Sequence, residues 1–82
     1  MKPTIGRVVV YKTTEQDQSL MKAKSETDGR CNVQEELPAV IVAVWSDECV
    51  NLKVNLDGDG EIWKTSINNG NEQGQWNWPE RI

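Results

Sequence analysis

The stretch that decides the fold is VNLKVNL, residues 50–56, in which apolar and polar residues alternate without a break. Successive side chains of a β-strand point to opposite faces of a sheet, so an alternating segment has one apolar face and one polar face. This pattern is typical of an antiparallel strand that packs one face on a core and exposes the other to water. Residues 50–56 therefore predict a half-buried antiparallel strand.

The segments around this strand predict a small sheet. Four further strands are expected, at residues 5–12, 38–45, 61–67 and 75–78. Residues 38–45 are almost all apolar and begin with Pro38. Strands tolerate proline at their first residue, so we expect a central strand here. The sequence Asp-Gly-Asp-Gly at 57–60 predicts a tight turn between neighbouring antiparallel strands.

Residues 13–36 have a different composition, because five of these 24 residues are apolar and nine are charged. We expect a long polar loop, in which residues 18–24 form a helical turn or two that docks Leu20 and Met21. Long loops in small domains are often functional or mobile. Five strands with one long loop after the first predict an all-β fold, a single SH3-like barrel domain over residues 1–82. A small open sheet and an OB-like barrel are the competing architectures.

The composition excludes several classes of function. The chain has 82 residues, no His and a net charge of −4. Without His there is no Ser-His or Cys-His nucleophile pair, and we expect a protein that is not an enzyme. The negative charge argues against non-specific binding to nucleic acid or to an anionic membrane. The longest apolar run, residues 39–45, is far shorter than the roughly 20 residues of a membrane span, and no signal peptide is recognisable. We therefore expect a soluble protein of the cytoplasm.

No metal or cofactor motif is complete. The carboxylates at 57, 59 and 61 have the spacing that opens a calcium loop, but Ile62 and Asn68 stand where that loop needs Gly and Glu. Cys31 and Cys49 are 18 positions apart and form no CxxC pair. We expect both thiols to be free, with Cys49 in the core and Cys31 accessible. The sequence predicts no cofactor and no metal.

The tryptophans are the strongest indication of function. Trp45, Trp63, Trp76 and Trp78 are four of the five aromatic residues, and indole rings are over-represented in binding hot spots. Because the chain has no Phe, we expect Trp45 or Trp63 to fill the core. Trp76 and Trp78 share one face of the last strand and are either core residues or part of a site. So much aromatic surface on a small domain also predicts a homo-oligomer that buries Trp76 or Trp78.

Cations near these rings predict a site for a nucleotide, with a base stacked on indole and phosphate held by Arg or Lys. The alternative is a solvated sheet face without a ligand. The candidate ligand-binding residues are Arg7, Trp63, Lys64, Trp76, Asn77, Trp78 and Arg81.

Several segments of the chain resemble a group of small uncharacterised tailed-phage accessory proteins. The similar segments are PAVIV at 38–42, VNLKV at 50–54, WKTSI at 63–67 and GQWNWPE at 74–80, with GRVV at 6–9 also fitting. The resemblance implies an SH3-like phage protein that acts by binding in the host cytoplasm. It implies no activity that can be assigned residue by residue.

Phage context leads to three expectations about function. The first is counter-defence, by sequestering a nucleotide immune signal such as a cyclic oligonucleotide or an ADP-ribose derivative. The second is inhibition of a host defence protein, including CRISPR effectors, through the acidic residues of 13–36. The third is an accessory role in virion assembly.

Overall fold

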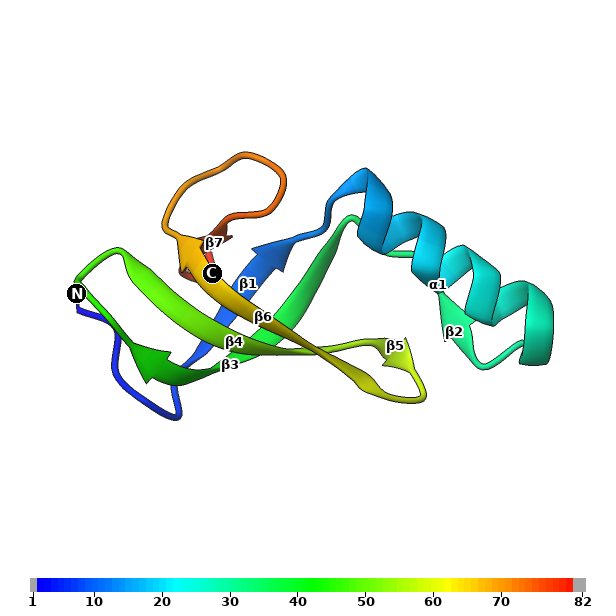
Figure 1. Cartoon of the computed structure of the whole chain (residues 1–82), viewed down its shortest axis with the longest axis horizontal. Coiled ribbons are helices and arrows are strands. Elements are labelled where there is room, and N and C mark those ends of the chain that lie inside the picture. Colours follow the sequence, from blue (N-terminus) through cyan, green and yellow to red (C-terminus); the bar gives the residue numbers. More distant parts are fainter. Residues whose placement is uncertain (1, 81–82) are drawn as a thin grey trace.

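The computed structural model describes residues 2–80 and consists mainly of a curled, five-stranded antiparallel sheet (Figure 1). The strand order is β6-β4-β3-β1-β7. The strands are β1 (Val8–Lys12), β3 (Glu36–Val44), β4 (Cys49–Asn55), β6 (Glu61–Asn68) and β7 (Trp76–Asn77). All five predicted strands are present, and the sheet curls into a half-barrel in agreement with the expected small β-barrel class.

The alternation in residues 50–56 positions β4 as predicted. Val50, Leu52 and Val54 are fully buried. A β-bulge between Val50 and Leu52 interrupts the pairing of β4 with β6 and places Asn51 inside as well. The buried amide is satisfied, because its Oδ1 accepts a hydrogen bond from the backbone N–H of Ser66 at 2.8 Å. The predicted alternation therefore holds for the buried Val50, Leu52 and Val54, and Asn51 departs from it.

The prediction of a long loop at 13–36 is wrong, because most of this segment is helix α1 (Glu15–Asp28). Thr14 and Asp17 form a capping box in which each side chain accepts from the other's backbone N–H, at 3.1 and 3.0 Å. Gly29 ends the helix in the left-handed conformation that favours glycine. The helix shows little apolar periodicity, because Met21 is its one fully buried side chain among those described. Its start and end are set by the caps.

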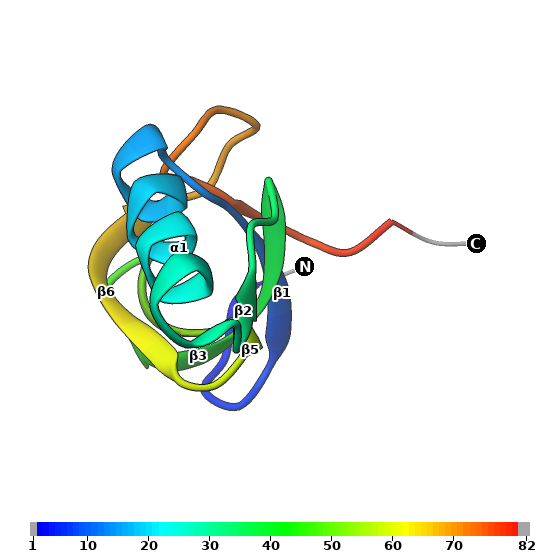
Figure 2. The same ribbon diagram turned by 90° about the vertical axis from the view of Figure 1, so that its right-hand side faces the viewer.

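Helix α1 lies at one end of the curled sheet (Figure 1). Figure 2 looks along the curled sheet and shows β6 and β1 curving past the two sides of α1. The chain leaves α1 through β2 (Cys31–Asn32), which pairs with β5 (Asp57–Gly58) in a separate two-stranded ribbon. A side chain at Gly58 would meet the backbone oxygen of Arg30 at 1.9 Å, so this crossing requires glycine.

The cysteines are both free thiols, as expected. Cys31 is buried and not accessible as predicted, because β2 carries it beneath α1 into the core. Cys49, expected in the core, is only half-buried. Among the described residues no helix is long and apolar enough to cross a membrane.

The expectation that Trp45 or Trp63 fills the core is also wrong. Trp45 is 66% exposed and Trp63 is 62% exposed. The large core aromatics are Trp76 and Tyr11, each about 1% exposed. They come from β7 and β1, which pair directly, so two adjacent strands supply the ring volume that the core needs.

Candidate functional site

The structure separates two of the residues expected to bind a nucleotide. Trp63 and Lys64 are neighbours on β6, so their side chains point to opposite faces of the strand. Trp63 lies on the outer face, and Lys64 points inward toward α1, where its Nζ lies 2.6 Å from Asp17 Oδ1. Arg81 lies outside the described residues. Lys64 is therefore held by a carboxylate and does not share a surface with Trp63.

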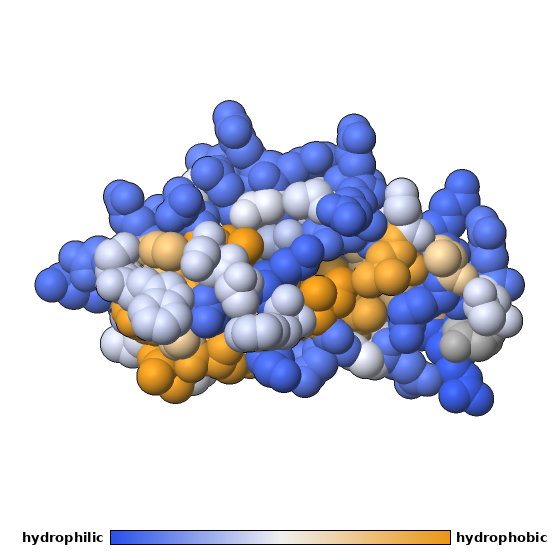
Figure 3. Space-filling model, in the orientation of Figure 1, coloured by the Kyte–Doolittle hydropathy of each residue, from blue (hydrophilic) through white to orange (hydrophobic). Residues whose placement is uncertain are grey.

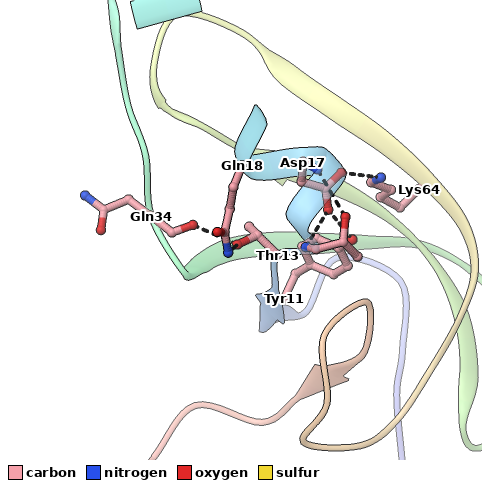
Figure 4. Close-up of polar contacts among 7 residues, drawn as sticks. Tyr11, Thr13, Asp17, Gln18, Gln34 and Lys64 are labelled. Atoms are coloured by element: carbon pink, nitrogen blue, oxygen red, sulfur yellow. Dashed lines mark hydrogen bonds and ion pairs between the residues drawn. The ribbon is translucent and has the colours of Figure 1, made fainter. Parts of the chain in front are cut away.

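Asp17 is the centre of a network that closes the barrel, drawn in Figure 4. Its side chain is 4% exposed and accepts hydrogen bonds from Tyr11 Oη at 2.6 Å and from the backbone N–H of Thr14 at 3.0 Å. Lys64 completes the set as an ion pair. We call these four residues, Tyr11, Thr14, Asp17 and Lys64, the α1 latch. The latch ties α1 to β1 and to the edge strand β6.

The latch shifts the titration of its two acids. Burial by itself would raise the pKa of Asp17, but hydrogen bonds from Lys64, Tyr11 and Thr14 outweigh it, and the pKa lies below its usual range. Burial, followed by the hydrogen bond to Asp17 and the negative charge of that group, raises the pKa of Tyr11 well above its usual value. Both groups are thus held in the forms that hydrogen-bond to each other, ionised Asp17 and neutral Tyr11.

The corner between β1 and α1 is closed in the same way. Thr13 is buried, and its hydroxyl donates to the backbone oxygen of Gln34 at 2.8 Å and accepts from Gln18 Nε2 at 3.0 Å (Figure 4). Among the described residues, every buried side-chain nitrogen or oxygen has a hydrogen-bond partner. This end of the molecule therefore offers no unsatisfied buried group to a substrate.

The other predicted residues do come together, at the opposite edge of the sheet. Trp76 is buried and donates from Nε1 to the backbone oxygen of Glu48 at 2.9 Å. Trp78 packs edge-on against Trp76, with ring centroids 5.2 Å apart. The guanidinium of Arg7 lies 5.5 Å from the centre of the Trp78 ring, a cation–π distance. Asn77 Oδ1 accepts from the backbone N–H of Trp78 at 2.8 Å. Trp76 is thus core, whereas Trp78 reaches the surface in a fixed position.

Trp78 lies at a surface depression that follows the outer side of β1. Two adjoining pockets form it, of about 460 and 400 Å³, and both are lined by Val10 and Glu36. The first is otherwise mainly apolar, and the second contains Trp78 and further polar groups. The remaining lining residues are Val8, Val9, Leu37, Pro38 and Pro79 in the first pocket, and Asn71, Asn77, Trp78 and Glu80 in the second. We call the two together the β1 groove.

The rim of the β1 groove carries two carboxylates, those of Glu36 and Glu80. Glu36 and Glu80 are exposed, and neither carboxylate forms an ion pair within 4 Å in the part of the chain that the structure describes. Lys12 is the register partner of Glu36 on β1, but its ammonium donates to the backbone oxygen of Asn71 at 3.0 Å. The groove therefore has an apolar floor, and its rim carries two carboxylates together with the guanidinium of Arg7, which lies over Trp78.

Glu80 was not among the predicted site residues, and Glu36 was predicted only as one of the acidic residues of 13–36 that would bind a host protein. The acidic pair Glu35-Glu36 is visible in the sequence. Glu36 is the first residue of β3, and this end of β3 forms one rim of the groove. Nothing in the sequence relates it to Glu80. The pairing of β1 with β3 on one side and β7 on the other brings them to the same pocket.

A second apolar area lies at the end of the sheet. Figure 3 shows hydrophobic residues at the lower left, where the N-terminal turn meets the end of β3. Ile5, Val42 and Val44 are exposed, and Gly6 N–H bonds to the backbone oxygen of Ile41 beside them. Trp45 follows directly and donates from Nε1 to Asn51 Oδ1 at 2.9 Å. This area is apolar but carries no polar group that would select a ligand.

Comparisons with protein-family models, curated proteins and solved structures find no match for this chain. Among the described residues no group of three or more Cys, Asp or Glu side chains could hold a metal ion.

Proposed function

We propose that this protein is a non-enzymatic binding protein and that its β1 groove binds a segment of a partner protein. The observation that carries the proposal is the placement of Trp78. Its ring is fixed by Trp76 and Arg7 at the wall of a depression with an apolar floor. A rigid aromatic beside an apolar pocket provides contact area at a low cost in conformational entropy.

The titration behaviour supports binding over catalysis. Asp17 and Tyr11 are the described groups with clearly displaced pKa values, and they hydrogen-bond to each other inside the α1 latch. Displaced pKa values mark catalytic sites when the groups line a cleft. Neither residue lines the β1 groove, so the displacement here accompanies a structural contact.

The resemblance to small phage proteins suggests the setting. We propose an SH3-like barrel, on the basis of its strand order and curl, that acts in the host cytoplasm on a host defence protein. The sequence pattern favoured the acidic residues of 13–36 for this contact. Helix α1 presents both Lys22 and Glu26 on its exposed surface, whereas the carboxylates of the β1 groove are concentrated beside apolar surface. The groove is thus the better candidate for the binding surface.

A nucleotide signal is the second candidate ligand, and the stacked pair of Arg7 and Trp78 favours it. Two observations count against it: Lys64 is paired with Asp17, and Glu36 and Glu80 would repel phosphate. Titration with cyclic dinucleotides, cyclic trinucleotides and ADP-ribose isomers tests it through tryptophan fluorescence. A saturable change that Trp78→Phe abolishes would favour the nucleotide over the protein partner.

The proposed function is tested by capture from host cells with three baits. These are the wild type, Glu36→Lys in the groove and Glu26→Lys on the exposed surface of α1, a matched control. We expect a host protein that the wild type and the Glu26→Lys bait recover and the Glu36→Lys bait loses. Recovery of the same proteins by all three baits would contradict a role for the groove.

A further inference from the structure

The two halves of the β1 groove differ in chemistry and are continuous. The apolar half is lined by Val8, Pro38 and Pro79, and the acidic half by Trp78 and Glu80. Val10 and Glu36 line both halves. One ligand can therefore touch the apolar half and the acidic half at the same time.

The floor of the groove sets a spacing for such a ligand. Val8 and Val10 are two positions apart on β1, so their side chains point to the same face about 6.6 Å apart. An extended peptide has the same two-residue repeat on each of its faces. Two ligand side chains that both face the groove therefore lie at positions i and i+2, the nearest pair on one face of an extended peptide.

The charge of the groove sets the kind of ligand. Glu36 and Glu80 lack ion-pair partners among the described residues. A third pocket at the β1–α1 corner is lined by Glu35 and Glu72 and by one cation, Lys12. The whole chain has a net charge of −4. A cationic side chain gains favourable contacts here, and a phosphate or a carboxylate does not.

We propose that the β1 groove binds an extended peptide segment in which an apolar side chain and a Lys or Arg lie two positions apart. The apolar side chain occupies the half formed by Val8, Pro38 and Pro79. The cation lies between Glu36 and Glu80. This inference rests on the proposed function and specifies the partner segment that the groove would take.

The experiment is a selection of random seven-residue displayed peptides on the intact protein. We expect enrichment of peptides with an apolar residue two positions from Lys or Arg. The same selection on the double variant Glu36→Lys/Glu80→Lys is expected to lose that enrichment in favour of Asp or Glu at the charged position. Glu26→Lys is the matched control, and its selected peptides should be those of the wild type.

Affinity measurements complete the test with one selected peptide, labelled with fluorescein and followed by anisotropy. We expect the double variant to bind about tenfold more weakly, and binding by the wild type to weaken as salt is raised, because exposed charges are screened. Circular dichroism checks that the double variant is folded, which is expected because both side chains are exposed.

Several outcomes would overturn the inference. Selected peptides without a Lys or Arg position, or the same peptides selected on the double variant, would show that Glu36 and Glu80 do not bind a ligand cation. A second outcome is that no peptide is enriched, but the Glu36→Lys bait still fails to recover a host protein that the wild type captures. The proposed function then stands, and the inference of an extended-peptide ligand is wrong. If peptide selection fails and sedimentation shows self-association that Glu36→Lys abolishes, the groove binds a second copy of this chain.

Discussion

The α1 latch and the β1 groove both place carboxylates beside β1, but the carboxylate of the latch is buried and paired, whereas those of the groove are exposed and unpaired among the described residues. Asp17 is 4% exposed and is contacted by Tyr11, Thr14 and Lys64. Glu36 is exposed and has no ion-pair partner among the described residues. A buried charge is tolerated when its partners replace water, whereas an exposed charge keeps its hydration and can exchange it for a ligand. The contacts of a carboxylate, more than its presence, separate a structural role from a binding role.

The comparison predicts the largest loss of stability at the centre of the latch. Asp17→Asn leaves the ammonium of Lys64, which is 26% exposed, without its anion. We expect a loss of about 3 kcal/mol in the free energy of unfolding, since removal of one partner of a buried pair is strongly destabilising. Urea denaturation at pH 7 measures it, with Glu15→Gln in the same first turn as the exposed control.

The pH dependence of this loss is a further check. The pKa of Asp17 is lowered in the folded state, so its contribution is present above the unfolded value of about 4 and is lost as pH falls. The difference between wild type and Asp17→Asn should therefore shrink below about pH 4. A difference that stays constant into acid would mean that Asp17 is not ionised in the fold.

The apolar contact of α1 ranks second. Met21 is fully buried and Leu20, its neighbour, is 50% exposed. We expect Met21→Ala to cost about 2 kcal/mol and Leu20→Ala less than about 0.5 kcal/mol. Equal costs in thermal unfolding would mean that α1 packs on the sheet through a different face.

Tyr11 is expected to contribute less than Asp17. Tyr11→Phe removes one hydrogen bond to a charged group and should cost about 1.5 kcal/mol near neutral pH. Because the pKa of Tyr11 is raised in the folded state, its stabilisation is present below about pH 10 and is lost as pH rises further. The difference between wild type and Tyr11→Phe should therefore decrease above pH 10. A difference that grows there would contradict the direction of the shift.

The smallest effect on stability is expected in the groove. Glu36→Gln and Glu80→Gln each remove an exposed charge and should change the free energy of unfolding by less than about 0.5 kcal/mol. Binding of the peptide selected on the wild type should nevertheless weaken. Loss of stability comparable to that of Asp17→Asn would remove the contrast between the two regions.

The alternating residues 50–56 were sufficient to predict β4, and the turn and strand patterns were sufficient for the other four strands of the sheet. Helix α1 was predicted only as a turn or two, although its capping box, Thr14 to Asp17, and its terminal Gly29 are readable in the sequence. The full length of α1 could not be recognised from hydrophobic periodicity, because a helix anchored by one buried side chain and a capped end has almost no apolar period. The expected homo-oligomer stays a prediction, and Trp76, expected at its interface, is already buried within the chain.

The sequence by itself determined the strands, their order along the chain and the lack of His, because these follow from local alternation, turn residues and composition. Only the tertiary structure decided the roles of like residues. Of the tryptophans, Trp76 lies in the core and Trp63 lies on the surface. Of the carboxylates, Asp17 is paired with Lys64 and Glu36 faces the groove. Side chains of one type differ here because the curl of the sheet sets which face of each strand is inside. That curl depends on the pairing of β1 with both β3 and β7, residues far apart in the sequence.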